Sequence, residues 1–504
     1  MHPGAYDPAR TAVVTADGTR TLSYGQLEER SLRLADHLRA AGLRRGDHIA
    51  LLCDNDPRAL EVYWATMRSG LYLTAVNHHL RADDVAHIVR DCGAAVLIHS
   101  GTLAQLATEV RELAVGPALV LDLDDGTYEK ALADASAVPP DRQPLGADML
   151  YSSGTTGRPK GIRTALPDGD VRDQPTTYTV VFQTMYGFGE DTVYLSPAPI
   201  YHAAPLRFCG VVTALGGTVV LMDTFDAEAA LAAVERHRVT HSQWVPTMFV
   251  RMLKLPAPVR ERYDLSSLRI AIHAAAPCPV EVKRRMMEWW GPVLYEYYSS
   301  TEGNGITFIS PEEWLRKPGS VGRDGFLGTL RICAEDGRVL PPGETGTVYF
   351  ERDERPFQYH GDDDRTREAQ HPAHPNWTTT GDIGHVDEDG YLFLTDRKAF
   401  MIISGGVNVY PQEAEDVLVL HPAVADVAVV GVPDAEMGET VKAVVQVEPG
   451  VAPGPELARE LVDFARERLA HYKAPRTVDF TERLPRTPTG KLAKARLRES
   501  YRRG

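Results

Sequence analysis

The sequence has few of the features that mark secreted or membrane-spanning proteins. Its 504 residues include only five cysteines, and these form no Cys-x-x-Cys pair, so we expect neither a disulfide framework nor a structural zinc site. The most apolar stretch, residues 209–222, contains three glycines and is too short to span a bilayer. The first ten residues, MHPGAYDPAR, lack the apolar core of a signal peptide. We therefore expect a cytoplasmic protein that does not insert into membranes.

The sequence also has fewer basic than acidic residues. The chain has 54 Lys and Arg against 69 Asp and Glu, which gives a formal net charge of −15. Such an acidic balance disfavours general binding to nucleic acids or anionic membranes, so we expect no nucleic-acid partner. Any anionic ligand must then be held by local groups. The length leaves room for two or three domains.

Alternating helix and strand patterns predict parallel sheets covered by helices in the first 320 residues or so. Residues 22–42 have helical spacing of leucines and begin with a capping box, Ser23 and Gln26. A buried-strand pattern follows at 48–56, and another helical pattern at 57–70.

The pattern changes after that region. Residues 328–353 are short strand-like runs separated by Gly, Pro and Asp, which predicts a β-rich subdomain. Strand patterns at 423–434 and 440–450 and an amphipathic helix at 456–472 predict a compact final unit. The basic run 491–503 is expected to be an exposed helix.

We therefore predict an α/β protein with two domains. The large N-terminal domain, residues 1–396, would contain two parallel-sheet α/β subdomains and a β-rich subdomain. The small C-terminal domain, residues 397–504, would be α+β.

One short stretch, YSSGTTGRPKGI at 151–162, has the composition of a phosphate-binding loop. Its glycines let backbone N–H groups point at an anion, its hydroxyls donate hydrogen bonds, and Lys160 adds charge. It fits neither G-x-x-x-x-G-K-[ST] nor G-x-G-x-x-G, and Pro159 and Gly161 disfavour a helix immediately after it. The composition alone also allows a flexible surface loop without a ligand.

Four further motifs follow this loop along the chain. They are YYSSTEGNG (297–305), TTTGDIGHVDEDGYLFLTDRK (378–398), MIISGGVNVYPQEAE (401–415) and LPRTPTGKL (484–492). With these motifs in this order, nearly the whole chain resembles the adenylate-forming superfamily, which contains acyl-CoA synthetases, peptide-synthetase adenylation domains and luciferases. The glycine-containing segment 401–415 is most similar to the carboxylic acid–CoA ligase branch. The resemblance implies ATP, Mg²⁺ and coenzyme A as cofactors, and an active site between the large domain and a mobile small domain.

The resemblance also implies roles for individual residues. For catalysis it implies Lys491, Glu302, Thr301 and His202, with Glu302 also the Mg²⁺ ligand. For ATP and AMP it implies Ser152, Ser153, Gly154, Thr155, Thr156, Gly157 and Lys160 at the phosphates, Ala275, Ala276, Pro277, Tyr297, Tyr298 and Ser299 around the adenine, and Asp382 and Arg397 at the ribose. For the pantetheine arm of coenzyme A it implies Ser404, Gly405 and Gly406. A carboxylate such as Asp382 suits a ribose because it can accept hydrogen bonds from both hydroxyls at once.

Two regions depart from the family pattern or are weakly specified. The hinge is expected at Asp396, Lys398 and Ala399, where relatives usually carry Asp or Lys at the position of Ala399. The acyl pocket is expected to be roomy and apolar, lined by Tyr201, His202, Phe208, Gly210, Ala274, Gly303 and Gly305.

The expected activity is ATP-dependent joining of a carboxylic acid to coenzyme A through an acyl-adenylate. We expect a medium-chain or bulky alicyclic or polycyclic acid, such as a terpenoid or steroid-like one, with an aryl acid as the close alternative. A carrier protein could replace coenzyme A as the acceptor of the acyl group. A luciferase-like oxygenase is a less favoured hypothesis for the activity. The chain could also be an inactive nucleotide-binding regulator. A homodimer is one assembly that the sequence allows.

Overall fold

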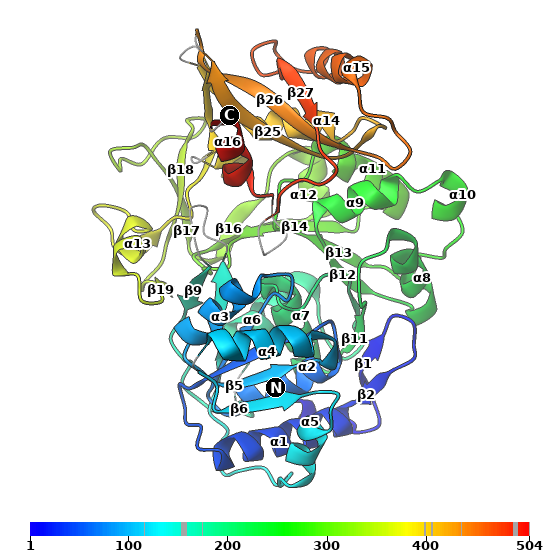
Figure 1. Ribbon diagram of the computed structural model, residues 1–504, viewed down its shortest axis with the longest axis vertical. Helices are drawn as coiled ribbons and strands as arrows, with labels where there is room; N and C mark the ends of the chain where they lie inside the picture. Colours follow the sequence, from blue (N-terminus) through cyan, green and yellow to red (C-terminus); the bar gives the residue numbers. More distant parts are fainter. Residues whose placement is uncertain are drawn as a thin grey trace.

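The computed structural model describes most of the chain. The described residues are 1–114, 116–152, 159–173, 175–397, 400–404, 407–434, 436–486 and 492–502. Figure 1 shows two parts, a large one that contains the N-terminus and a smaller one at the top that contains the C-terminal residues.

The largest sheet has nine strands in the order β16-β15-β14-β13-β12-β10-β11-β1-β2. Its strands are β1 (Thr11–Thr15), β2 (Thr21–Ser23), β10 (Val193–Ser196), β11 (Thr218–Leu221), β12 (His241–Trp244), β13 (Ile270–His273), β14 (Leu294–Ser299), β15 (Ile306–Ile309) and β16 (Arg323–Leu327). The strands from β14 to β1 run parallel, and β2, β15 and β16 are antiparallel to their neighbours. The helices of this part of the chain are α6 (Thr177–Tyr186), α7 (Ala203–Ala214), α8 (Ala227–His237), α9 (Pro246–Leu253), α10 (Ala257–Arg260), α11 (Val280–Trp290) and α12 (Pro311–Arg316).

A second parallel sheet has the order β6-β5-β3-β4-β7. It consists of β3 (His48–Leu52), β4 (Tyr72–Ala75), β5 (Ala94–His99), β6 (Leu119–Asp122) and β7 (Ala147–Asp148), with helices α1 (Tyr24–Ala40), α2 (Arg58–Met67), α3 (Ala82–Asp91), α4 (Ala104–Leu113) and α5 (Thr127–Ala133). Ser23 caps α1 through the predicted capping box with Gln26. One continuous apolar core joins the two sheets through α2 and α7, because residues of both helices belong to it.

Two smaller sheets complete the large part. The first is β19 (Gln358–Tyr359), β9 (Lys160–Arg163) and β8 (Leu150–Ser152), in that order. The second contains β17 (Thr329–Cys333), β18 (Gly346–Glu351), β20 (Trp377–Thr378), β21 (Asp382–Val386) and β22 (Leu392–Arg397), which is the β-rich subdomain that the sequence predicts. Helix α13 (Asp363–Glu368) follows β19.

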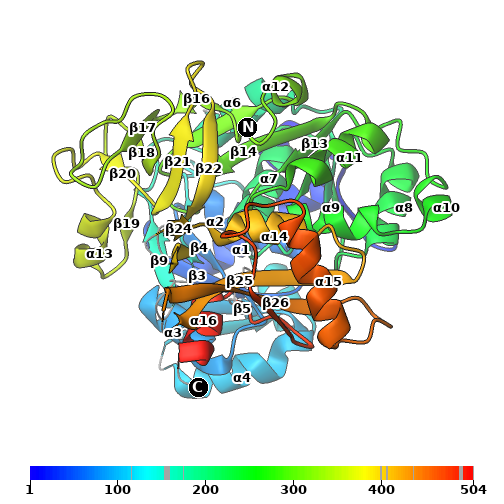
Figure 2. The same cartoon turned by 90° about the horizontal axis from the view of Figure 1, so that it is seen from above.

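The final unit is built on the sheet β24-β23-β26-β25, with β27 beside β26. Its elements are β23 (Ile402–Ser404), β24 (Val407–Val409), β25 (Val424–Asp434), β26 (Gly438–Val447), β27 (Thr477–Phe480), α14 (Pro411–Leu418), α15 (Pro455–Arg466) and α16 (Lys494–Arg502). Seen from above, its two long strands lie across the rest of the molecule (Figure 2). Lys254 at the end of α9 reaches this unit, where its ammonium contacts the carbonyl of Val424 and the carboxylate of Glu448.

The C-terminal helix differs from the expectation of an exposed basic helix. Lys494 is 7% exposed, and its Nζ lies 2.8 Å from Oε2 of the buried Glu415. Leu497 is buried in an apolar cluster with residues of β25, and Arg498 pairs with Glu439. Two of its basic side chains thus have acidic partners, one on α14 and one on β26, and Leu497 packs against β25. Sequence composition does not reveal these partners.

Candidate functional site

The predicted site residues gather where strands β13 and β14 end. Because these strands are parallel, their carboxyl ends lie at the same edge of the sheet, which is the usual place for a ligand in such folds. Ala274 to Pro277 follow β13, and Thr301 to Gly303 form the turn between β14 and β15.

A hydrogen bond joins β14 to the β-rich subdomain at this edge. The phenol of Tyr298 donates to Oδ2 of Asp382 over 2.7 Å, and the hydroxyl of Thr380 donates to the same oxygen over 2.8 Å. Asp382 is 8% exposed, so these donors compensate part of the cost of burying its charge. Arg397 is the residue directly opposite Asp382 in the β21–β22 pair. The two residues predicted to bind the ribose therefore lie directly opposite each other on adjacent strands.

Glu302 connects this edge to the sheet that carries the phosphate loop. Glu302 is 8% exposed and accepts a hydrogen bond of 3.0 Å from the phenol of Tyr359. Burial and the neighbouring Glu302 carboxylate both raise the pKa of Tyr359, so the phenol stays protonated and keeps donating. Tyr359 lies opposite Ile162 in the β19–β9 pair. This contact was not predictable from the sequence, because Tyr359 lies in none of the motifs.

The two strands on either side of the predicted phosphate loop pair with each other. Ser152, the last residue of β8, lies opposite Lys160, the first residue of β9. No helix follows the loop directly, as Pro159 and Gly161 predict; strand β9 begins there instead. Nζ of Lys160 lies 3.2 Å from Oδ2 of Asp362. The pKa of the Asp362 carboxyl is lowered first by a hydrogen bond from the backbone N–H of Arg365 and then by Lys160.

The segment after β13 contains a strained residue. Ala275 has a φ of +76°, and Arg238 is the only other non-glycine residue with positive φ in the described chain. This conformation brings Cβ of an L-residue close to its own backbone. Ala275, Ala276 and Pro277 are exposed at the edge of the sheet, whereas Ala274 is buried.

The predicted acyl-pocket residues divide into two groups. Tyr201 and His202 are half-buried just before α7 with ring centroids 4.5 Å apart, and burial raises the pKa of Tyr201 to about 12. Phe208 is 1% exposed and stacks on Phe182 at 4.4 Å, so it belongs to the core.

The glycines of that pocket differ from one another. The space beside Gly305 is filled by the ring of Phe350, and the space beside Gly210 by the ring of Tyr63, so these two glycines make room for protein side chains. This corrects the expectation that they line an open pocket, and the cause is that aromatic rings from other elements pack against them. Gly303, with φ of +64°, is half-buried, and among the described residues the Tyr178 hydroxyl is the atom nearest to where its Cβ would lie, at 3.9 Å.

Tyr178 belongs to a polar group that the sequence did not reveal, and its hydroxyl is the part of that group that lies beside Gly303. The side chains that interact in this group are Tyr63 on α2, Asp148 on β7, Tyr178 on α6 and Arg207 on α7, together with the predicted Tyr297 on β14. Nε of Arg207 lies 2.8 Å from Oδ2 of Asp148, and its guanidinium carbon lies 5.2 Å from the centre of the Tyr178 ring. The only sequence signal was a single charged residue within the apolar helix α7.

The remaining predictions fall on the small unit or outside the described residues. Asp396 accepts a hydrogen bond of 3.2 Å from the backbone N–H of Gln412, and Ser404 is a buried residue at the end of β23. The following predicted site residues lie outside the described chain: Ser153, Gly154, Thr155, Thr156, Gly157, Lys398, Ala399, Gly405, Gly406 and Lys491.

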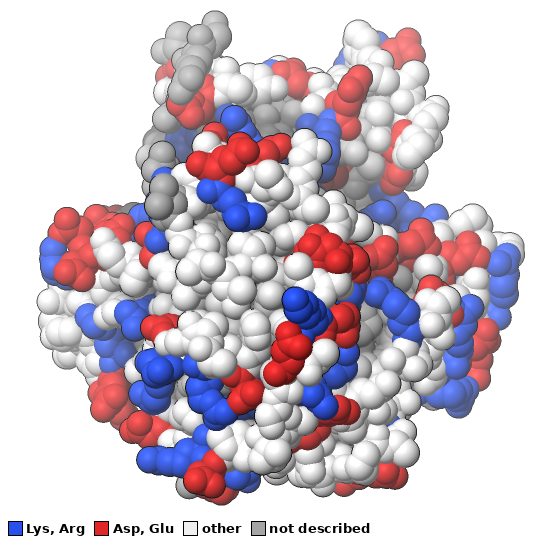
Figure 3. Space-filling model, turned by 60° about the horizontal axis from the view of Figure 1, so that its bottom comes forward, with Lys and Arg blue, Asp and Glu red and all other residues white. Residues whose placement is uncertain are grey.

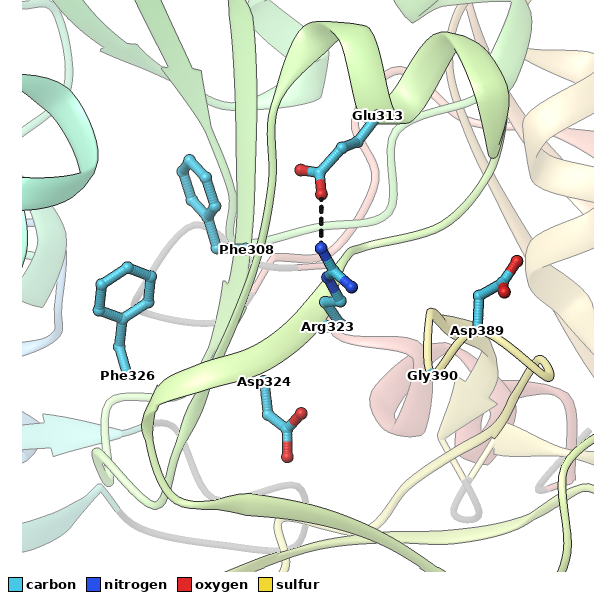
Figure 4. Close-up of a pocket in the computed structure, with 7 residues that line it drawn as sticks. All are labelled: Phe308, Glu313, Arg323, Asp324, Phe326, Asp389 and Gly390. Atoms are coloured by element: carbon cyan, nitrogen blue, oxygen red, sulfur yellow. Dashed lines mark hydrogen bonds and ion pairs between the residues drawn. The ribbon is translucent and has the colours of Figure 1, made fainter.

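Other features of the surface contain none of these residues. An open cavity of about 570 Å³ lies at β15 and β16, between Phe308, Phe326 and the Glu313–Arg323 ion pair (Figure 4). Acidic and basic side chains are interspersed on the face shown in Figure 3. Among the described residues, no three His, Cys, Asp or Glu side chains are grouped as metal ligands. No described helix is long and apolar enough to cross a bilayer.

Comparison with known proteins covers nearly the whole chain. The model of the AMP-binding enzyme family matches residues 3–354, and the model of the AMP-binding enzyme C-terminal domain matches residues 413–491. A feruloyl-CoA synthase from Amycolatopsis sp is 37% identical over 500 residues, which cover 98% of this chain and 96% of that protein.

Two further proteins agree with this placement. The ligase from Mycobacterium tuberculosis that acts on 3-[(3aS,4S,7aS)-7a-methyl-1,5-dioxo-octahydro-1H-inden-4-yl]propanoate, as its name states, is 34% identical over 516 residues, covering 98% of this chain and 96% of that protein. The crystal structure of ATP-bound MatB from Rhodopseudomonas palustris superimposes with a TM-score of 0.82 at 29% identity, over 98% of this chain and 96% of that one. The chain therefore belongs to the AMP-binding, adenylate-forming enzyme family, in the branch of the carboxylic acid–CoA ligases.

Proposed function

We propose that this enzyme binds ATP at the edge formed by β13, β14 and β21 and uses it to join an aryl carboxylic acid to coenzyme A. The observation that carries the proposal is the convergence of Asp382, Glu302 and the stem of the phosphate loop at that edge, through Tyr298 and Tyr359. Similarity to a CoA ligase over nearly the full length of both chains supports the same reaction.

The reaction would proceed in two steps. A carboxylate oxygen of the acid attacks the α-phosphorus of ATP, and the bond to the β-phosphate breaks, so pyrophosphate leaves and an acyl-adenylate forms. The thiolate of coenzyme A then attacks the acyl carbon, and AMP leaves with the electrons of the broken C–O bond. Because both anions of the first step must approach each other, positive charge near them provides most of the catalysis.

We assign roles to this chain's residues accordingly. Asp382 would accept hydrogen bonds from the ribose hydroxyls, with Arg397 beside it, and the segment from Ala274 to Pro277 would lie along the adenine opposite Tyr298. Lys160 would exchange its partner Asp362 for the phosphates. Lys491 would contact the carboxylate and the α-phosphate.

Glu302 is suited to hold Mg²⁺. The ion binds proteins through one or two carboxylates and otherwise through phosphate oxygens and water, so a single buried Glu beside the phosphates fits, and no cluster of acidic residues is needed. When bound, Mg²⁺ supplies charge neutralisation at the phosphates. Tyr359 would hold the Glu302 carboxylate in place.

We further propose that the chain divides at residues 396 and 397, with the small unit turning between the two steps. The backbone hydrogen bond to Asp396 and the contacts of Lys254 would hold one of its orientations. The segment around Ser404 would line the path of the pantetheine arm in the other.

An aryl acid is favoured over the medium-chain or alicyclic acid expected from the sequence. The half-buried rings of Tyr178 and Tyr297 occupy the acyl side of the site, and flat rings stack well on aromatic side chains. The relative of 37% identity is a feruloyl-CoA synthase, whereas the alicyclic-acid ligase is 34% identical, which keeps a bulky alicyclic acid as the second candidate.

The proposal is tested by mass spectrometry of reactions that contain ATP, Mg²⁺, coenzyme A and one acid from a panel of aryl, alicyclic and aliphatic acids. We expect acyl-CoA and AMP in equal amounts, with an aryl acid as the fastest substrate. Pyrophosphate release without acyl-CoA for every acid would remove coenzyme A as acceptor and favour a carrier protein. ATP binding without turnover of any acid would favour an inactive regulator.

A further inference from the structure

The ion pair between Arg207 and Asp148 is nearly buried at the acyl side of the site. The side chain of Arg207 is 15% exposed and that of Asp148 is 12% exposed, and the pair is held by one hydrogen bond of 2.8 Å from Nε to Oδ2. Burial disfavours the charged form of Arg207, but the Asp148 carboxylate outweighs this and raises its pKa. Arg207 therefore keeps its positive charge at this position.

This pair is only partly satisfied by protein. In the part of the chain that the structure describes, no hydrogen bond reaches either Nη group of Arg207 or Oδ1 of Asp148. These atoms are not among the fully buried polar atoms that lack a partner, so they reach open space beside the pair. Their remaining donors and acceptor are therefore accessible to a ligand.

The surroundings place that ligand on the substrate side. The guanidinium lies over the Tyr178 ring, and the Tyr178 hydroxyl lies beside Gly303, the residue after Glu302. Tyr297, the neighbour of Tyr298 on β14, stacks toward Phe208 with ring centroids 6.3 Å apart. An acid that reacts near Glu302 and extends between these rings would reach Arg207 with its remote end.

The chemistry of the pair selects the group at that end. A hydroxyl can accept a hydrogen bond from an Nη group of Arg207 and donate one to Oδ1 of Asp148. A ketone or ether can only accept, and a second carboxylate would be repelled by Asp148. Resting on the proposed ligase function, we propose that Arg207 and Asp148 are specificity-determining residues that bind a hydroxyl at the end of an aryl acid remote from its carboxylate.

The test compares 4-hydroxycinnamate with cinnamate, which differ only in that hydroxyl. For the wild-type enzyme we expect kcat/KM to be at least about 10-fold higher for 4-hydroxycinnamate, because a site that hydrogen-bonds a hydroxyl rejects the analogue that lacks it. In the double variant Arg207→Met/Asp148→Leu, which leaves neither charge unpaired, the ratio should fall to about 1, because neither acid then finds a hydrogen-bonding partner at its remote end.

A matched control removes a surface pair of the same residue types. Arg269 and Asp191 lie 2.8 Å apart and are 51% and 68% exposed, and Arg269→Met/Asp191→Leu should retain the wild-type preference. Equal use of both acids by the wild type, an unchanged ratio in the Arg207/Asp148 variant, or a preference for 4-carboxycinnamate would each overturn the inference.

Calorimetric binding of the two acids separates this inference from the proposed function. If no acid gives acyl-CoA, but the wild type binds 4-hydroxycinnamate at least about 10-fold more tightly than cinnamate and the double variant does not, the pair recognises a hydroxyl and the ligase proposal alone fails. Equal binding of both acids to the wild type would contradict the role of the pair.

Discussion

The phenol of Tyr298 donates a hydrogen bond of 2.7 Å to Oδ2 of Asp382, and this bond connects the nine-stranded sheet to the β-rich subdomain. Asp382 is buried at that junction and sits opposite Arg397 in the adjacent strand. The carboxylate is therefore oriented before any nucleotide binds. Pre-oriented groups of this kind reduce the entropic cost of binding.

The first prediction concerns this carboxylate. Asp382→Asn should raise the KM for ATP by about 10- to 100-fold with a much smaller effect on kcat, because hydrogen bonds to charged groups contribute about 1.5–3 kcal/mol and the ribose is held equally throughout the reaction. Steady-state kinetics with ATP as the varied substrate measures this. Asp387→Asn, at the far end of the same hairpin, should leave the KM for ATP unchanged. A folded Asp382→Asn enzyme with a KM within about 2-fold of wild type would contradict the role.

The second prediction concerns backbone strain at Ala275. Its φ of +76° is unfavourable for alanine and free of cost for glycine. Ala275→Gly should raise the free energy of unfolding by about 0.5–1 kcal/mol, the net of relieved strain and greater freedom of the unfolded chain. The shift in the urea midpoint at unchanged slope measures it.

Ala276→Gly is the matched control, because Ala276 has no positive φ. It should lower the free energy of unfolding by about 0.5–1 kcal/mol, since glycine there only adds freedom to the unfolded chain. Equal effects of the two substitutions would show that Ala275 carries no strain.

Local patterns predicted much of the fold. The sequence predicted the capping box of α1, the absence of a helix directly after residues 151–162 and the β-rich region, because each depends on residues close together in the chain. The motifs likewise placed Tyr298, Asp382 and Glu302 as candidates. Contacts between elements far apart in the sequence could not be predicted. Tyr359 and Glu302 are 57 residues apart, and Arg207 and Asp148 are 59 residues apart. No periodic pattern in the sequence indicates that such residues meet.

Two predictions that rested on composition were wrong because of packing between elements. Gly210 and Gly305 were predicted to leave space for a ligand, but the rings of Tyr63 and Phe350 fill that space. The basic run 491–503 was predicted to be exposed to solvent, but Glu415 and Glu439 form ion pairs with two of its basic side chains. In both cases the partner comes from another element, so only the three-dimensional structure identifies it.

The third prediction concerns the buried pair of Lys494 and Glu415. Lys494→Met should lower the free energy of unfolding of the small unit by about 3–5 kcal/mol, because it leaves the Glu415 carboxylate buried without its partner. Burial already raises the pKa of Glu415, with Lys494 opposing the shift, so the variant should raise it further. The measurement is the urea midpoint of the small unit's transition.

The destabilisation should depend on pH in a defined direction. A carboxyl whose pKa is higher in the folded than in the unfolded state binds protons on folding, so its contribution is fully present below the unfolded pKa and is lost as the pH rises through the folded pKa. The defect of Lys494→Met should therefore be smaller at acidic pH than at pH 8. Lys494→Met/Glu415→Gln should recover most of the stability and lose this pH dependence. A defect that is the same at both pH values would contradict the assignment.

The fourth prediction separates the two steps of the reaction. Lys491→Ala should reduce acid-dependent exchange of pyrophosphate into ATP by at least about 100-fold, because the lysine would neutralise charge only where carboxylate and phosphate meet. The same variant should convert supplied acyl-adenylate and coenzyme A to acyl-CoA at a rate close to wild type. Equal loss of both steps in a folded variant would remove Lys491 from this role.

The most direct measurement of the central claim follows oxygen atoms from the acid to the nucleotide. When the acid carries ¹⁸O in its carboxylate, attack on the α-phosphorus of ATP transfers one labelled oxygen, and the later attack by coenzyme A leaves that oxygen on AMP. We predict AMP with one ¹⁸O in its phosphate for each acyl-CoA formed, detected by mass spectrometry. Label in inorganic phosphate with ADP as the other product, or unlabelled AMP, would contradict the acyl-adenylate route.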